Sequence, residues 1–197
     1  MEIPKEAFDA IVQELQRRPL EINKYRLQSG TGRSQTFGLV NRRCLPPDYS
    51  RLCLLRPYLY KLLLDFGEQY VPFSFNAITV NQGYKADKHR DKHNLGNSFL
   101  VAFGNFTGGE LVIHEGDLSG THNIQYKPII TDFSKVFHSV NDFQGERYSL
   151  VFYTLTSNRL QPLPLPSVRK ENDKFFFYRG EEKITNGLPH PLKKKKL

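Results

Sequence analysis

The sequence has too few cysteines to build a cysteine-based framework. Only Cys44 and Cys53 occur among its 197 residues, which excludes a set of disulfides or a cysteine-rich zinc module. Scarce cysteine is typical of proteins in a reducing compartment, and we expect an intracellular setting. The chain also has no recognisable secretory signal and no apolar run of about 18 residues, so we predict neither secretion nor a membrane span.

Tryptophan is absent, but the other aromatic residues are plentiful. Fifteen phenylalanines and ten tyrosines favour β-strands. A hydrophobic fraction of 39% is typical of a globular protein rather than a disordered one. The length predicts a single domain with an ample core and short appendages, and we expect a monomer.

The positive charge is concentrated at the C-terminus. The formal net charge is +8, and the four lysines at 193–196 account for half of it. The body is therefore only mildly basic, which permits a polyanionic partner such as DNA but does not require one. The lysine run is typical of a nuclear-import signal or a nucleic-acid contact, and equally of a solvated terminus, so a nuclear location is one of these alternatives.

Two stretches show the apolar spacing of amphipathic helices. Residues 4–18 place Phe8 and Leu15 on one face, and residues 49–70 follow the same pattern. Pro57 is expected to kink or split the second helix, because proline cannot sit in a helix interior without breaking its hydrogen bonds.

The region between these helices is predicted to be irregular. Residues 20–44 read as short strand-like pieces around a turn at 29–34, where Gly30 and Gly32 occur without the Lys-Ser/Thr of a phosphate loop. The pair Pro46-Pro47 is expected to break the chain before the second helix.

The remainder of the core reads as β-strands separated by glycine, asparagine and aspartate turns. Seven segments carry the pattern: 74–82, 97–103, 109–114, 123–126, 129–133, 136–140 and 146–155. This count and spacing predict an α+β fold, a double-stranded β-helix (jelly roll) with the N-terminal helices packed on one sheet.

We divide the chain into three parts by composition. Residues 1–73 form a helical and strand support region of the same domain, and 74–160 form the catalytic core. Residues 161–197 hold a proline-spaced linker, the aromatic segment 175–178 and the basic tail. The aromatic segment is expected to add an edge strand or to cover the body, and residues 189–197 to lack fixed structure.

A metal site is predicted by His89, Asp91 and His138. A His-x-Asp pair with one distant histidine is the ligand set of a facial iron(II) site, which leaves coordination positions open for a cosubstrate and O2. Arg147 opens the last strand-like run of the core, and its planar guanidinium can grip a carboxylate through two hydrogen bonds. Together they predict an oxygenase that uses Fe(II) and 2-oxoglutarate, with the three ligands as its catalytic residues.

Other residues compete for places in this site. His93 is a rival ligand, because it shares a helical spacing with His89. The remaining alternatives are His114 and His122 as ligands, Asp87 and Asp117 as carboxylates without the one-residue offset, Tyr84 as a hydrogen-bond donor to the cosubstrate, and Arg42 or Arg43 as a further cosubstrate contact rather than a solvated edge.

Two segments resemble a known family. Residues 89–97, HRDKHNLGN, resemble the iron-binding segment of the ten-eleven translocation (TET) and base J-binding protein family, and residues 147–153, RYSLVFY, are similar to the segment after its distal histidine. The resemblance covers residues 74–155 well and 1–73 loosely. It implies a double-stranded β-helix, Fe(II), 2-oxoglutarate and O2 as cofactors, and a DNA base flipped into the pocket as substrate.

The resemblance also implies residue roles. His89, Asp91 and His138 would bind iron, and Arg147 would hold the distal carboxylate of 2-oxoglutarate, with Arg42 or Arg43 as a weaker match for a second arginine. Asn94 would hydrogen-bond the base and Tyr153 would stack on it, with His93 beside them. Leu155 stands where TET proteins place a cytosine-reading histidine, which leaves the base preference open. The zinc-binding cysteine-rich region of animal TET proteins is missing.

The function expected from these residues is oxidation of 5-methylcytosine in DNA to 5-hydroxymethylcytosine, with further oxidation left open. Demethylation of N6-methyladenine in DNA is an alternative, because Leu155 removes one cytosine contact. A protein prolyl or lysyl hydroxylase would share every site residue except the roles of Asn94 and Tyr153. A DNA- or chromatin-binding module is the non-enzymatic alternative, and the intact set of metal ligands argues against it.

Overall fold

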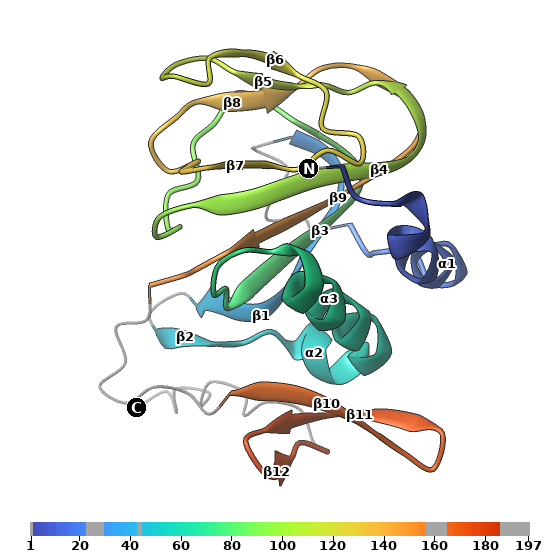
Figure 1. The fold of residues 1–197 in the computed structure, drawn as a ribbon. Coiled ribbons are helices and arrows are strands. Elements are labelled where there is room, and N and C mark those ends of the chain that lie inside the picture. The colour runs from blue at the N-terminus through green and yellow to red at the C-terminus, as the bar shows by residue number, and fades with distance from the viewer. Residues whose placement is uncertain (1, 23–29, 43–44, 157–164, 186–197) are drawn as a thin grey trace, which may run out of the picture.

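The computed structural model describes residues 2–22, 30–42, 45–156 and 165–185. They form a six-stranded antiparallel sheet with helices on one face and a three-stranded sheet on the other, while a second three-stranded sheet lies outside the helices (Figure 1). The two sheets that face one another make the predicted double-stranded β-helix core, so the predicted fold class is confirmed.

The helices form where the apolar spacing predicts them. A 3-10 turn, η1 (Lys5–Phe8), leads into α1 (Asp9–Arg17). The second predicted helix is divided into α2 (Arg51–Leu55) and α3 (Pro57–Tyr70), because Pro57 starts a new helix where its missing N–H costs nothing. Among the described residues, no helix is long and apolar enough to cross a membrane.

The large sheet has the order β2-β1-β3-β9-β4-β7, and the sheet facing it has the order β6-β5-β8. Their strands are β1 (Gly30–Arg42), β2 (Leu45–Tyr49), β3 (Ala77–Ala86), β4 (Ser98–Gly108), β5 (Leu111–Ile113), β6 (Gly120–His122), β7 (Ile129–Thr131), β8 (His138–Val140) and β9 (Phe143–Tyr153).

Alternation along the central strands gives the large sheet two different faces. On β9, Leu150 and Phe152 pack with the helices in the main hydrophobic core. Arg147, Ser149 and Val151, at the alternate positions, line a cavity on the face toward the small sheet. One face of the large sheet therefore supplies stability, and the other supplies a site.

The strand predictions fail in three places. The predicted turn at 29–34 lies largely in β1, where Gly30 pairs with Ala86 of β3 and Gly32 lies at a register shift between the two strands. A Cβ on Gly32 would lie 2.1 Å from the Gly83 carbonyl oxygen. Glycine is needed there for close approach of two strands rather than for a turn. Pro46-Pro47 lies inside β2, an edge strand, where a missing N–H is tolerated. Residues 123–126 form no strand, since the chain pairs earlier, as β6.

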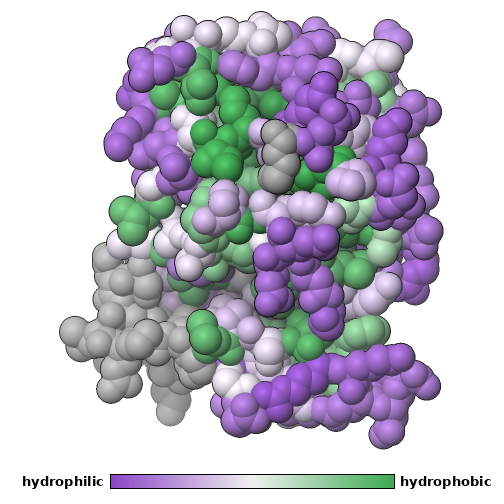
Figure 2. Space-filling view, in the orientation of Figure 1, coloured by the Kyte–Doolittle hydropathy of each residue, from purple (hydrophilic) through white to green (hydrophobic). Residues whose placement is uncertain are grey.

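The C-terminal aromatic segment covers the helices. It lies in β11 (Lys174–Arg179), between β10 (Pro166–Glu171) and β12 (Glu182–Lys183), in a sheet separate from the core. The Phe177 ring is fully buried, 5.6 Å from Tyr49 and 6.0 Å from Tyr60 between ring centroids. Hydrophilic residues line the outer side of this sheet (Figure 2). Residues 161–164 of the predicted linker and the lysine tail lie outside the described residues.

Candidate metal and cosubstrate site

Two histidines from distant parts of the chain face each other at the mouth of the β-helix. The His89 N–H donates to the His138 carbonyl at 3.0 Å, and the His138 N–H donates back at 2.9 Å. Residues that exchange both bonds in this way present their side chains on the same side of the backbone. The two imidazole centroids are therefore only 4.3 Å apart.

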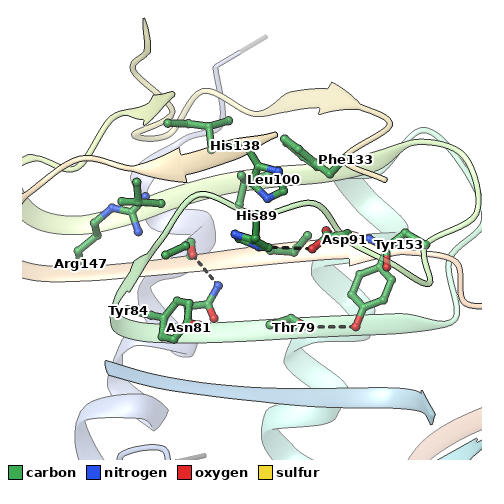
Figure 3. Close-up of a pocket in the computed structure, with 16 residues that line it drawn as sticks. Thr79, Asn81, Tyr84, His89, Asp91, Leu100, Phe133, His138, Arg147 and Tyr153 are labelled. Atoms are coloured by element: carbon green, nitrogen blue, oxygen red, sulfur yellow. Dashed lines mark hydrogen bonds and ion pairs between the residues drawn. The ribbon is translucent and has the colours of Figure 1, made fainter. Parts of the chain in front are cut away.

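Asp91 completes the group. Its backbone N–H donates to the Phe133 carbonyl at 3.0 Å, which fixes the chain two residues beyond His89. The Asp91 Oδ1 atom lies 3.6 Å from His89 Nε2. One donor atom from each of His89, Asp91 and His138 lies within 4.8 Å of the others. The three residues line one cavity (Figure 3).

Both histidines are held in the tautomer that metal binding needs. His89 Nδ1 lies 2.7 Å from the Asp87 carbonyl oxygen, and His138 Nδ1 lies 3.2 Å from that of Val136. A carbonyl can only accept, so each Nδ1 carries the hydrogen and each Nε2 keeps its lone pair. Burial lowers the pKa of His138, although the charge of Asp91 acts in the opposite direction, and the lower pKa favours the neutral ring. Two imidazoles that each present Nε2 and one carboxylate fit a divalent first-row metal such as Fe(II).

A buried cation lies in the same cavity. Arg147 is 2% exposed, and its Nε donates to the Gly109 carbonyl at 3.2 Å between the Phe106 and Phe143 rings. Burial lowers its pKa to about 10, although the charge of Glu110 acts in the opposite direction. In the described part of the chain no carboxylate pairs with this guanidinium, so its charge is left for an anionic ligand.

The cavity between these groups is small and mixed in character. Its volume is about 90 Å³. Apolar side chains, among them Leu100, Leu111 and Phe133, line it together with polar side chains of β3 and β9. Such a cavity suits a small molecule that has charged ends and must be shielded from water.

Three polar residues that line this cavity, Thr79, Asn81 and Ser149, were not predicted from the sequence as site residues. Ser149 accepts from Asn81 Nδ2 at 3.0 Å, and the Thr79 hydroxyl lies 3.1 Å from that of Tyr153 (Figure 3). Period-two alternation from Arg147 would have found Ser149, since residues two apart on a strand share a face. Asn81 and Thr79 follow because β3 pairs with β9 in register.

Tyr84, which we expected to contact the cosubstrate, lines the cavity because of a bulge in β3. Between β1 and β3, Arg33 pairs with Gln82 but Thr31 pairs with Lys85, so β3 carries an extra residue near Gly83. The bulge shifts the alternation of β3, and Tyr84 faces the cavity on the side of Asn81.

The expected base-pocket residues divide between the cavity, a neighbouring cleft and the core. Asn94 and Tyr153 line the cavity. His93 is exposed and lines a separate cleft of about 540 Å³, whose wall also includes Asn94. Leu155 is not among the residues that line the cavity; it packs with Leu39 and Tyr153 in a small apolar cluster. A histidine there would have to enter this cluster.

The structure does not bring Arg42 to the cavity. Its guanidinium lies in the same separate cleft, 3.4 Å from Asp48, and its Nε donates to the Pro46 carbonyl at 2.9 Å. A direct cosubstrate contact by Arg42 therefore has no support in its position, and Arg43 lies outside the described residues.

The rival metal ligands also lie outside the group. His93, His114 and His122 supply no atom to it; His114 Nε2 is 2.9 Å from the Ser139 hydroxyl, and His122 Nε2 is 2.7 Å from the Leu118 carbonyl. Asp87 and Asp117 are exposed and are likewise not part of it.

Comparison by sequence found no matching family model and no matching curated protein. Comparison of structures found several oxygenases. NgTET1 in complex with 5mC DNA is 15% identical over 78% of this chain and 69% of that chain, with a TM-score of 0.53. An oxidoreductase of the 2OG-Fe(II) oxygenase family from Burkholderia pseudomallei is 20% identical over 76% of this chain and 81% of that chain, with a TM-score of 0.50. A prolyl-4-hydroxylase from Pseudomonas putida is 14% identical over 78% of this chain and 89% of that chain, with a TM-score of 0.48.

The fold of this chain is therefore the one shared by NgTET1 and the Burkholderia pseudomallei oxygenase. At these identities the likeness concerns the fold alone, and the chemistry has to be argued from the side chains of this site.

Proposed function

We propose that the protein is an Fe(II)- and 2-oxoglutarate-dependent dioxygenase that oxidises 5-methylcytosine in DNA. The observation that carries the proposal is the joining of two groups in one small cavity. His89, Asp91 and His138 offer a metal three donors from one side, and the unpaired buried cation of Arg147 lies in the same cavity. A binding module has no need of such a combination.

The three ligands would hold Fe(II) on one face and leave its other positions to cosubstrate and O2. When bound, the iron and 2-oxoglutarate supply the oxidising chemistry: the cosubstrate is decarboxylated to succinate and carbon dioxide, and one oxygen atom of O2 enters a substrate C–H bond. The protein's part is to position the reactants and to keep water out.

Arg147 would bind the distal carboxylate of 2-oxoglutarate. Its guanidinium is fixed at Nε by Gly109, which leaves the two terminal nitrogens for a bidentate contact. Ser149, two residues along the same strand face, offers a hydroxyl beside it. The apolar side chains that line the cavity, among them Leu100 and Phe133, would help to exclude water from the cosubstrate.

A nucleic-acid substrate is supported by the surroundings of the cavity. The neighbouring cleft carries Arg42, Lys92 and His93 and shares Asn94 with the cavity, so a strand whose phosphates lie along the cleft could present a base at the metal site. The resemblance of residues 89–97 and 147–153 to TET proteins supports the same substrate. Tyr153 offers its ring for stacking on a base in the cavity.

The experiment that tests the proposal is mass spectrometry of nucleosides from DNA incubated with the protein, Fe(II), ascorbate and 2-oxoglutarate. Parallel reactions contain 5-methylcytosine DNA, N6-methyladenine DNA or proline- and lysine-containing peptides, and succinate is measured in each. We expect 5-hydroxymethylcytosine, and no product from the Asp91→Ala variant.

The outcomes separate the two levels of the proposal. Oxidation of only the adenine substrate or only a peptide would retain the dioxygenase and replace its substrate. Absence of succinate from every reaction, with metal and cosubstrate saturating, would overturn the dioxygenase itself.

A further inference from the structure

Asn94 makes a contact that a base-reading role does not require. Its side-chain Nδ2 donates to Asp91 Oδ2 at 3.0 Å and to the Ser98 hydroxyl at 3.2 Å. A carboxylate can only accept, so the nitrogen of the amide must be the atom that faces Asp91. The NH2 group of the amide is therefore bonded within the protein, and its oxygen is the atom available to a ligand.

The two oxygens of Asp91 are consequently different. Oδ1 lies on the histidine side, 3.6 Å from His89 Nε2, whereas Oδ2 is held by Asn94. A carboxylate held in this way presents one oxygen to a metal and is hindered from rotating. Hydrogen bonds of this kind orient metal ligands and tune their basicity.

Asn94 is itself anchored on two sides. Ser98, which receives the second bond of its amide, is fully buried at the start of β4. The backbone of Asn94 forms a bridge with Leu155, and the N–H of the next residue, Leu95, donates to the Thr154 carbonyl at 2.8 Å. The side chain of Asn76 closes this junction by bonding both the N–H and the carbonyl of Leu155, at 2.8 and 3.0 Å.

We infer that Asn94 is a positioning residue for the metal ligand Asp91, in addition to any contact it makes with substrate. The inference rests on the proposed metal site, and it gives Asn94 a function before substrate arrives. Asn94 also lines both the cavity and the neighbouring cleft that carries Arg42 and Lys92. A ligand in the cleft that hydrogen-bonds its amide oxygen would thus contact the residue that orients Asp91.

The test is the affinity of the metal-free protein for Mn²⁺, a redox-stable substitute for Fe(II), measured by calorimetry without DNA or 2-oxoglutarate. We expect Asn94→Ala to bind Mn²⁺ about 10- to 100-fold more weakly than wild type, the usual loss when a residue that supports a metal ligand is removed. Asn97→Ala is the matched control, because it deletes an exposed amide from the same loop, and we expect wild-type affinity.

Other measurements exclude a merely structural effect. Thermal unfolding of the metal-free variant reports whether it folds. If Asn94→Ala does not fold, Asn94→Gln replaces it, since its longer side chain keeps the amide but displaces the donor from Asp91; Mn²⁺ binding at least fivefold weaker supports the inference and unchanged binding overturns it.

A residue that only reads a base would give a different result. Asn94→Ala would then bind Mn²⁺ normally, and its defect would be confined to the KM for DNA, which overturns the inference alone. Failure of wild type to oxidise DNA leaves the metal measurement intact, so the substrate proposal and this inference fail separately. Failure of wild type to bind Mn²⁺ overturns the metal site and the role of Asn94 with it.

Discussion

His89 and His138 are joined by two reciprocal backbone hydrogen bonds, and this pairing places their rings 4.3 Å apart. Two of the candidate ligands, His89 and Asp91, lie in the loop between β3 and β4, and this bridge ties the loop to His138 of β8 in the small sheet. Because the backbone holds the histidines, their side chains can be exchanged without removing the bonds that position them.

The first prediction follows from this arrangement. His89→Ala and Asp91→Ala should abolish turnover of 2-oxoglutarate and weaken metal binding at least 100-fold, since each removes a direct ligand. The fold should survive, because both side chains are partly exposed. Succinate assay, Mn²⁺ binding and circular dichroism together check it. His122→Ala, which removes a histidine outside the group, should match wild type, and retained turnover in Asp91→Ala would remove that residue from the site.

The second prediction concerns pH and His138. Burial lowers its pKa below the usual 6.5 in the folded protein, so the unfolded chain binds the proton more readily. Stability of the metal-free protein is then highest above pH 6.5, falls as the pH drops through 6.5, and stops falling below the folded pKa. Urea unfolding at intervals from pH 8 to pH 5 should show a smaller decrease for His138→Gln than for wild type. Parallel curves for the two proteins would contradict the assignment.

Much of this arrangement can be predicted from the sequence, and the rest depends on register. The apolar spacing of α1 and α3 and the alternation of β9 predict their burial. His89, Asp91 and His138 can be grouped as one set of metal ligands because a His-x-Asp pattern followed by a distant histidine is a specific combination. The failure at Gly30 has a physical reason: a glycine that permits a turn and one that permits close strand approach look alike in sequence.

The roles of Asn94 and Ser149 could not be predicted for a different reason. Asn94 meets Asp91 of the same loop and Ser98 at the start of β4 through side-chain bonds that no helix or strand periodicity predicts. Backbone bonds tie this loop to residues 154 and 155, just after β9. Ser149 becomes a site residue only once β9 is known to turn that face toward the small sheet. The role of a short polar side chain depends on its position in the fold, whereas a histidine or arginine suggests a role by its residue type alone.

The third prediction concerns Arg147. Its buried charge is unpaired in the described residues, so its presence costs stability until a carboxylate binds. Arg147→Met should raise the KM for 2-oxoglutarate about 10- to 150-fold, because a hydrogen bond to a charged group is worth roughly 1.5–3 kcal/mol. The same variant should unfold at a higher temperature than wild type in the absence of cosubstrate. Steady-state kinetics and calorimetry check the two effects.

Arg147→Lys serves as the control for charge alone. Lysine keeps the positive charge but cannot make the planar bidentate contact, so the KM should lie between those of wild type and Arg147→Met, without the gain in unfolding temperature. A wild-type KM in Arg147→Met would place the cosubstrate carboxylate elsewhere.

The last prediction concerns the base. The Tyr153 ring lines the cavity, and its hydroxyl lies 3.1 Å from the Thr79 hydroxyl, a contact that anchors the far end of the ring and does not use its face. Stacking of a base on an aromatic ring is worth about 1–3 kcal/mol, so Tyr153→Ala should weaken binding of 5-methylcytosine DNA about 5- to 150-fold. Tyr153→Phe keeps the face and loses only the bond to Thr79, so its effect should be much smaller. The measurement is DNA affinity and oxidation at fixed salt, because phosphate contacts make both salt-dependent. Equal effects of the two substitutions would indicate that the hydroxyl, and not stacking, is what the substrate requires; no effect of either would place the base outside this cavity.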